Sequence, residues 1–293
     1  WIGVKQLIKK HACYLSIALL VAPLVAWADV LPDPPANPLQ QTLLQLPQAC
    51  PTLAPGLTPQ TQALLQAFYE GQNYQPVWAQ EGRLAALQAA LPQLADDGLD
   101  PLNYRLPQGQ DLCADIGTSR QYLQALQDLR FGRLAQNRFE PVWHANTEEP
   151  DRQAELLAIA GPGVQNVAGA FELARPALAQ YQDLRRVYAR ERQQPLPQWQ
   201  SIPDGPLLRP GMQDARVPAL ARRLASEGYL SGQPQIVNNT YSNELASAVK
   251  SFQLDHSLQA DGVIGPGTVK ELNVSPATRR EQLRINLERF RWM

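Results

Sequence analysis

Histidine and lysine are scarce in this chain, which has three His and five Lys among 293 residues. No His-Glu-x-x-His pattern is present, and His144 and His256 lie too far apart in sequence to suggest a zinc site. Lys and Arg together number 26 against 27 acidic residues, so the basic surplus that nucleic-acid binding requires is missing. Phosphate-loop and dinucleotide-binding fingerprints are also absent. We therefore expect no metal, no cofactor and no nucleic-acid partner.

Long apolar runs are absent except for one of about 15 residues at positions 12–26, which three of the five lysines precede. This run is shorter than the roughly 20 residues of a membrane-spanning helix, and Pro23 interrupts it. The sequence Ala-Trp-Ala before Asp29 has the small-x-small pattern of a secretory cleavage site. We expect a signal peptide over residues 1–28, cleaved after Ala28, and a periplasmic protein. The less favoured alternative is a single membrane anchor.

Cysteine is equally rare, with three residues in the whole chain. Cleavage after residue 28 would remove Cys13 and leave Cys50 and Cys113, an even number in an oxidising compartment. This favours a disulfide between them. Two unrelated buried thiols remain the alternative, because the sequence gives no distance between the two positions.

Proline is concentrated in residues 29–58, where it removes backbone donors and favours extended conformations, so we expect a leader without helices. Residues 59–200 contain apolar residues at helical spacing and predict a helical scaffold domain. The expected helices cover residues 59–70, 83–94, 119–136, 151–159, 165–173 and 176–192, with breaks at 96–98, 161–163 and 195–197. No series of alternating strands is found, so the predicted fold class is mainly α.

A second unit is predicted over residues 206–274. Helices are expected at 214–227, 242–256 and 266–272, and their apolar stripes would converge on one small core. At about 70 residues, such a domain has only marginal stability of its own.

The second unit has a dense local motif, Asp-Gly-Val-Ile-Gly-Pro-Gly-Thr at residues 261–268. Together with Ala-Val-Lys-Ser-Phe-Gln at 248–253 and Gly-Tyr at 228–229, it resembles the three-helix type of peptidoglycan-binding module. The residues that match the module motif are Gly211, Val217, Gly228, Phe252, Asp261, Gly262, Gly265 and Thr268. The resemblance implies a small helical bundle that binds peptidoglycan, with these residues serving mainly as its structural framework.

The contact with peptidoglycan should come from exposed polar and aromatic side chains around a shallow groove. The candidates are Tyr229, Tyr241 and Gln253. In the loop, Asp261 is expected to accept hydrogen bonds from backbone N–H groups. Gly262 and Gly265 are expected to adopt positive φ on either side of the apolar pair.

Three further fragments resemble the scaffold domain of large periplasmic L,D-transpeptidases of Gram-negative bacteria. They are Phe-Tyr-x-x-x-x-Tyr-x-Pro-x-Trp from residue 68, Asp-Gly-Leu-x-Pro from residue 97, and Tyr-x-x-Leu-Arg from residue 181. In that family a wall-binding module follows the scaffold, and a helix like residues 276–293 leads into the catalytic domain. The resemblance therefore implies an N-terminal portion that stops before a catalytic domain.

The family's reaction is acyl transfer through a Cys thiolate in a Ser-His-Gly-Cys-type motif, which this sequence lacks. Cys50 and Cys113 do not match that nucleophile, and the two histidines beyond the predicted signal fit surface or capping roles. Glu148 and Glu149 are adjacent and therefore make a poor glycosidase pair. We expect the chain as given to be inactive alone, to bind peptidoglycan and to meet other wall-synthesis proteins. A complete non-catalytic adaptor is the alternative, and a hydrolase with an unrecognised site is a weaker one.

Overall fold

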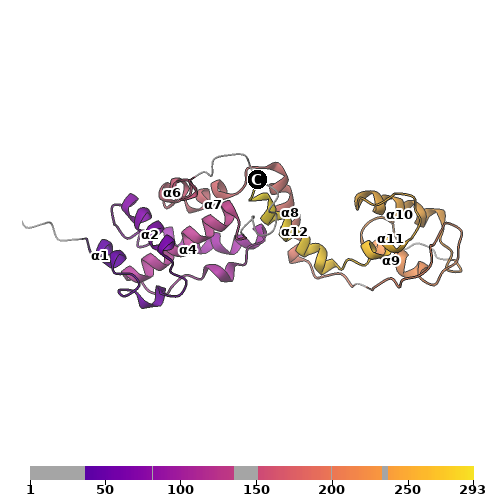
Figure 1. Cartoon of the computed structure of the whole chain (residues 1–293), viewed down its shortest axis with the longest axis horizontal. Helices are drawn as coiled ribbons and strands as arrows, with labels where there is room; N and C mark the ends of the chain where they lie inside the picture. Colours follow the sequence, from indigo (N-terminus) through magenta and orange to yellow (C-terminus); the bar gives the residue numbers. More distant parts are fainter. Residues whose placement is uncertain (1–36, 81, 135–150, 199, 233–236) are drawn as a thin grey trace, which may run out of the picture. The chain divides into compact units, whose positions relative to one another are not determined.

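The computed structural model describes residues 37–80, 82–134, 151–198, 200–232 and 237–293. Over these ranges the chain is mainly α-helical and forms no strand beyond two isolated β-bridges, which confirms the predicted fold class (Figure 1). None of the helices in the described ranges combines the length and apolarity needed to cross a membrane. The predicted signal peptide, His144 and the Glu148–Glu149 pair fall outside the described residues.

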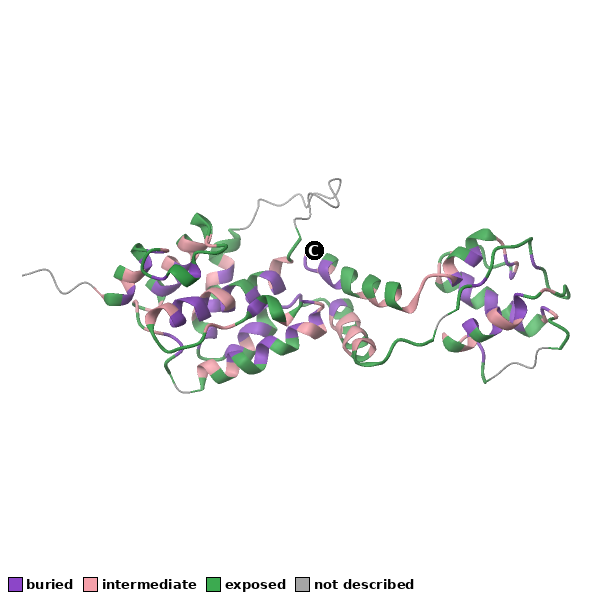
Figure 2. Cartoon of the chain, turned by 90° about the horizontal axis from the view of Figure 1, so that it is seen from below, coloured by how far each residue is buried: buried purple, intermediate pink, exposed green. Residues whose placement is uncertain are grey.

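The N-terminal part of the chain has seven helices among its described residues, and all but the last contribute buried side chains to one apolar core. They are α1 (Pro38–Leu44), α2 (Pro59–Gly71), α3 (Arg83–Ala90), α4 (Leu112–Phe131), α6 (Arg152–Gly163), α7 (Val167–Ala174) and α8 (Ala179–Gln193). Short 3₁₀ segments connect them: η1 (Pro51–Leu53), η2 (Leu91–Asp97) and η3 (Pro101–Tyr104). The central element is α4, which contacts α2, α6 and α7 and is buried along much of its length (Figure 2). We call this unit the helical domain.

The expectation of an extended leader over residues 29–58 is wrong in its described part. Helix α1 begins with Pro38 at its first position, where a missing N–H costs nothing. The Asn37 side chain accepts hydrogen bonds from the backbone N–H groups of Leu39, at 2.9 Å, and of the next residue. Leu39 and Leu43, one helical turn apart, are both buried in the core. Apolar burial thus outweighs the bias of the neighbouring prolines.

Several helices begin or end at other residues than the sequence predicts. The helix expected at 119–136 begins at Leu112, because the Asp111 carboxylate accepts the backbone N–H of Ala114 at 2.8 Å. The break expected at 161–163 lies a few residues later, because α6 continues to Gly163 and α7 begins at Val167. A Cβ on Gly163 would lie 2.5 Å from the Tyr122 hydroxyl, so this glycine permits close helix packing and does not form a turn. The region expected as one helix at 83–94 divides into α3 and η2.

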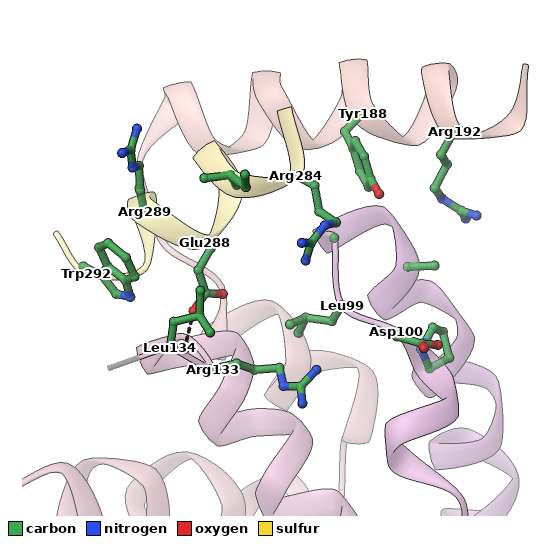
Figure 3. A pocket seen from close by; sticks show the side chains of 14 residues that line it. Leu99, Asp100, Arg133, Leu134, Tyr188, Arg192, Arg284, Glu288, Arg289 and Trp292 are labelled. Atoms are coloured by element: carbon green, nitrogen blue, oxygen red, sulfur yellow. Dashed lines mark hydrogen bonds between the residues drawn. The ribbon is translucent and has the colours of Figure 1, made fainter. Parts of the chain in front are cut away.

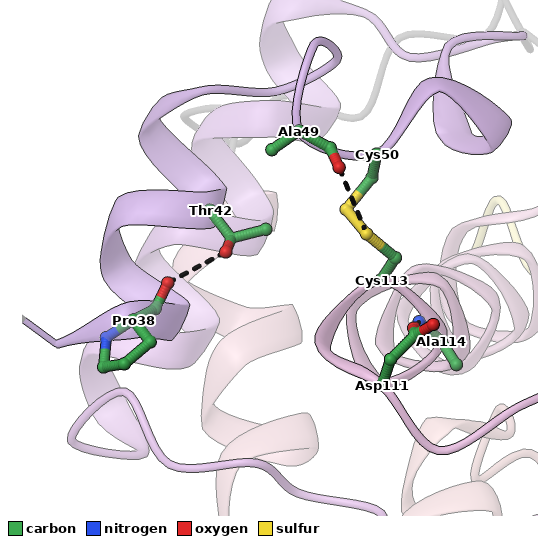
Figure 4. The surroundings of a disulfide bond; sticks show 7 residues. All are labelled: Pro38, Thr42, Ala49, Cys50, Asp111, Cys113 and Ala114. Carbon is green, nitrogen blue, oxygen red and sulfur yellow. Dashed lines mark hydrogen bonds between the residues drawn. A yellow bond between two sulfur atoms is a disulfide. The ribbon is translucent and has the colours of Figure 1, made fainter.

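A disulfide joins Cys50 to Cys113, with Cα atoms 5.5 Å apart (Figure 4). Cys50 immediately precedes η1, and Cys113 lies in the first turn of α4. The bond closes a loop with a sequence separation of 63 residues. It fixes the segment that contains η1 to the central helix.

The second unit contains α9 (Val217–Ser226), α10 (Asn243–Asp255) and α11 (Pro266–Leu272). Its separate core is formed by buried apolar residues of these three helices and of their connections: Ile202, Leu208, Val217, Leu220, Ala221, Leu224, Leu230, Tyr241, Leu245, Ala246, Ala248, Val249, Phe252, Ile264, Val269 and Leu272. We call this unit the three-helix module.

The last helix, α12 (Pro276–Phe290), does not end in the three-helix module but packs against α8 of the helical domain. The chain therefore leaves the helical domain after Gln193 and returns to it at α12. The three-helix module is formed by the chain between two helices that contact each other.

Candidate functional site

The motif loop of the three-helix module is held by one buried amide. Gln253 is 1% exposed, and its Nε2 donates to the Val263 carbonyl at 3.0 Å and to the Thr268 hydroxyl at 3.1 Å. Its Oε1 accepts the backbone N–H of Gly262 at 2.8 Å. The expectation that this side chain is exposed for ligand contact is therefore wrong: its polar atoms are used inside the module.

Tyr241 is a second correction of the same kind. It is fully buried, and its hydroxyl donates to the Gly262 carbonyl at 2.7 Å. Burial raises the pKa of this hydroxyl, so it stays protonated and keeps donating. Both side chains shape the loop from within and expose almost no surface.

Tyr229 is the accessible member of the three candidates. Its ring is half-buried and meets the Phe252 ring edge to face, with centroids 5.5 Å apart. Its hydroxyl donates to the Asp255 carboxylate at 3.0 Å, and this pair is exposed. Burial, followed by the hydrogen bond to Asp255 and then the charge of that carboxylate, raises the pKa of Tyr229 to about 12. The Tyr229 hydroxyl and the Asp255 carboxylate are therefore both accessible to solvent, and the Tyr229 ring beside them packs on Phe252.

The motif residues act as framework. Val217, Phe252 and Thr268 are buried, and Asp261 accepts the backbone N–H of Val263 at 2.8 Å, as expected for a loop-stabilising carboxylate. Gly211 and Gly228 have positive φ, of 89° and 83°.

The two loop glycines differ. Gly262 has φ 73°, a conformation that side chains rarely adopt. Gly265 has φ −111° and extended backbone, so the expected positive φ is wrong there. A Cβ on Gly265 would lie 3.2 Å from Leu207, which makes close packing the feature that this position requires.

His256 ends α10 as its C-cap residue. Its Nδ1 lies 3.2 Å from the Glu271 carboxylate, and its ring lies against that of Phe252 with centroids 4.2 Å apart and a tilt of 40° between the planes. Within the described ranges, no group of three or more His, Cys, Asp or Glu could hold a metal ion.

A buried carboxylate organises the contact between α12 and the helical domain. Asp97 is 0% exposed and receives Arg175 Nε and Nη2 at 3.0 to 3.1 Å. The Arg185 Nε lies 2.8 Å from the same carboxylate, and the Tyr181 hydroxyl donates to it at 2.9 Å. Two arginines and a phenol therefore compensate the charge of one carboxylate that water cannot reach.

Helix α12 joins this cluster through Arg291. Its guanidinium donates to the backbone oxygen of Asp97 and, at 3.2 Å, to the Tyr181 hydroxyl. It also donates to Glu288 at 2.7 Å, and Glu288 accepts the backbone N–H of Leu134 at 2.8 Å. We call Asp97, Arg175, Tyr181, Arg185 and Arg291 the Asp97 cluster. It brings together residues of η2, α8 and the end of α12, which are far apart in the sequence.

A further buried carboxylate, Asp128 of α4, lies near this contact. Tyr104 donates to it at 2.8 Å and Gln124 at 2.7 Å. Burial raises the pKa of Asp128, while these two hydrogen bonds lower it, and the net direction is upward.

Comparisons with protein families match two segments of the chain. Residues 63–187 match the model of a scaffold domain, and residues 213–272 match the model named "Putative peptidoglycan binding domain". No curated protein matches the chain. The second match coincides with the three-helix module and supports peptidoglycan as a partner. Helix α12 lies beyond both matched segments.

Proposed function

We propose that the chain binds peptidoglycan through residues 206–274 and serves as the scaffold and wall-binding portion of an L,D-transpeptidase-like protein of the periplasm. The observation that carries the binding proposal is the family match over residues 213–272, a segment that folds as a closed three-helix bundle with its motif loop fixed from within. A rigid loop retains its shape without a ligand, which lowers the entropic cost of binding.

The binding surface should be the outer face near Tyr229 and Asp255. Sugar hydroxyls and peptide amides can hydrogen bond to this exposed pair, and apolar sugar faces can contact the tyrosine ring. A shallow site of this kind binds each repeat weakly. The wall is a repeating polymer, so one module meets many equivalent sites along each strand.

The L,D-transpeptidase proposal is supported by the order of the parts. A matched scaffold segment comes first, the matched wall-binding segment second, and α12 third. The parent reaction needs a thiolate. Cys50 and Cys113 are bonded to each other, so neither of them supplies one. In this proposal the chain positions wall peptides, and a separate Cys-containing domain performs the acyl transfer.

Co-sedimentation with purified sacculi tests the binding proposal. The deletion removes residues 208–272, and a short Gly-Ser linker replaces them. Such a linker is feasible because Ile202 and Asn273, on either side of the deletion, are joined by hydrogen bonds of 2.8 Å. We expect the full chain to pellet and the deletion to stay in the supernatant. Equal pelleting of the two would overturn the proposal.

Two tyrosine variants refine the site. Tyr229→Ala should weaken pelleting several-fold, because it removes the accessible ring. Tyr229→Phe is the matched variant: it keeps the ring and removes only the exposed hydroxyl, so it should weaken pelleting less than Tyr229→Ala. Equal pelleting of the wild type and a folded Tyr229→Ala would show that the proposed face is wrong.

The alternative is a complete wall-binding adaptor without an enzymatic partner domain. The reading frame downstream of Met293 distinguishes the two proposals: a β-rich segment with a Ser-His-Gly-Cys motif supports the first, and a stop codon supports the adaptor. Release of muropeptides from sacculi by the purified chain would instead establish a hydrolase.

A further inference from the structure

A cavity of about 780 Å³ opens where α12 meets the helical domain (Figure 3). Its walls come from the segment between η2 and η3, the end of α4, α8 and α12. This volume falls in the range of pockets that bind small ligands. Four segments distant in sequence thus build one site, and it lies outside the three-helix module.

The lining of the cavity contains more arginines than carboxylates. Arg133, Arg192, Arg284 and Arg289 line it, against two carboxylates, Asp100 and Glu288. Both carboxylates already have partners within the protein. Asp100 accepts the backbone N–H of Leu102 at 2.9 Å, and Glu288 accepts hydrogen bonds from Leu134 and Arg291.

Two of the arginines are suited to receive an anion. Arg133 reaches Asp128 only through its Nε, at 3.6 Å, and its side chain is 46% exposed. Arg284 pairs with Glu281 of its own helix, and both side chains are about half exposed. Exposed ion pairs of this kind contribute little free energy, so a ligand carboxylate can replace them. Figure 3 shows Arg133 and Arg284 extending from two walls toward Leu99.

The rest of the lining is apolar or aromatic. Leu99, Leu134 and Ile285 provide aliphatic surface, and Tyr188 and Trp292 provide rings. Inorganic phosphate would leave this surface unused. A short peptide with free carboxylates and small aliphatic side chains uses both parts of the cavity, because its carboxylates can accept paired hydrogen bonds from the guanidinium groups.

We propose that this cavity binds a short anionic peptide, the class to which the stem peptides of peptidoglycan belong. The source of the peptide rests on the proposed function, since a protein that binds the wall is surrounded by such peptides. The three-helix module would then hold the polymer, while the cavity would hold one of its peptide branches.

Isothermal titration of the full chain with a synthetic stem tetrapeptide tests the proposal. We expect saturable binding that weakens as NaCl rises from about 0.05 to about 0.5 M, because added salt screens the arginines. The same peptide with its carboxylates amidated should bind at least tenfold more weakly. Equal binding of the amidated peptide, or no binding of the free acid at millimolar concentration, would overturn the proposal. This comparison requires no variant.

A double variant, Arg133→Gln with Arg284→Gln, tests whether these two arginines bind the peptide carboxylates. It should lower the affinity for the free-acid tetrapeptide at least tenfold. Arg186→Gln is the matched control. Arg186 is an exposed arginine of α8, paired with Asp183, and it does not line the cavity. Thermal unfolding verifies that both proteins fold. Unchanged affinity in the folded double variant would refute the assignment.

Different measurements test wall binding by the three-helix module and peptide binding by the cavity, so one proposal can fail while the other holds. The chain that lacks residues 208–272 should pellet with sacculi much less than the full chain but retain binding of the free tetrapeptide. Sacculus binding without any tetrapeptide binding by the full chain would overturn the cavity proposal and leave the proposed function intact.

Discussion

Replacing Asp97 by Asn should strongly destabilise the helical domain. The substitution preserves the size of the side chain but removes the charge that compensates Arg175 and Arg185. Asp97 is fully buried and the Arg175 side chain is only 2% exposed, so water cannot take over the lost interaction. The Tyr181 hydroxyl also loses a charged acceptor at 2.9 Å.

The expected loss follows from this burial. Removing one partner of a buried ion pair typically costs about 3 to 5 kcal/mol, because the remaining charge stays buried without compensation. For a domain of this size the loss corresponds to a fall in melting temperature of roughly 10 °C. The neighbouring residue provides the control: Asp96 pairs with Arg192 at 2.6 Å, but these side chains are 24% and 32% exposed. Asp96→Asn should cost less than about 1 kcal/mol.

Urea unfolding followed by circular dichroism compares the two variants. Amide hydrogen exchange in α8 and α12 assigns the transition to the helical domain, because the three-helix module can unfold separately. In Asp97→Asn, exchange in α12 should accelerate together with that in α8. If the two variants agreed within 1 kcal/mol, the Asp97 cluster would not stabilise the fold in the way argued above.

Three further predictions concern other parts of the chain. Replacing Cys50 and Cys113 together by Ala opens a loop of 63 residues and should lower the free energy of unfolding by about 4 kcal/mol, measured in urea. Because burial raises the pKa of Asp128, this carboxyl binds its proton more readily in the folded state. The stability of the wild-type protein relative to Asp128→Asn should therefore increase as the pH falls from about 7 to about 4, and a flat difference would contradict this. Gly262→Ala places a Cβ at φ 73° and 3.1 Å from a backbone oxygen of α10, which should cost the module about 1 to 3 kcal/mol in thermal unfolding. Gly267→Ala is its control, because this helical position has open space, and it should be neutral or slightly stabilising.

Most helices are predictable from the sequence, because apolar residues at helical spacing indicate the buried face of a helix. The helices expected at 242–256 and 266–272 occur as α10 and α11 with nearly the same bounds. Proline density predicts extended backbone over α1, whereas the position of Pro38 allows a helix start. An Asn followed by Pro is also a helix start, and the leucine pair of α1 one turn apart was the available signal.

The candidate site was harder to predict because residue type does not reveal exposure. Tyr241 and Gln253 were chosen as polar groups able to contact a ligand, but the loop needs those same polar atoms for its own backbone. A buried amide and an exposed one look identical in a sequence. Only the fold shows which backbone groups would otherwise remain without partners.

The Asp97 cluster and the cavity were both missed for a further reason. Their members are spread over almost 200 positions, and a motif search examines each fragment alone. Arg291 lies in the segment 276–293, and nothing in its sequence position indicates that it contacts the backbone of Asp97. The local signal was the unusual density of arginine in α8 and α12, the two helices that meet there.

The return of α12 to α8 also constrains biosynthesis. Because α8 ends at Gln193 and α12 ends at Phe290, the ribosome translates about 100 further residues before the last helix of the helical domain is complete. Until then Tyr181 and Asp97 lack Arg291, and the surface that later contacts α12 is exposed. The three-helix module can fold during this interval from contacts within its own short segment. We therefore expect it to acquire protease resistance on the nascent chain before the helical domain does.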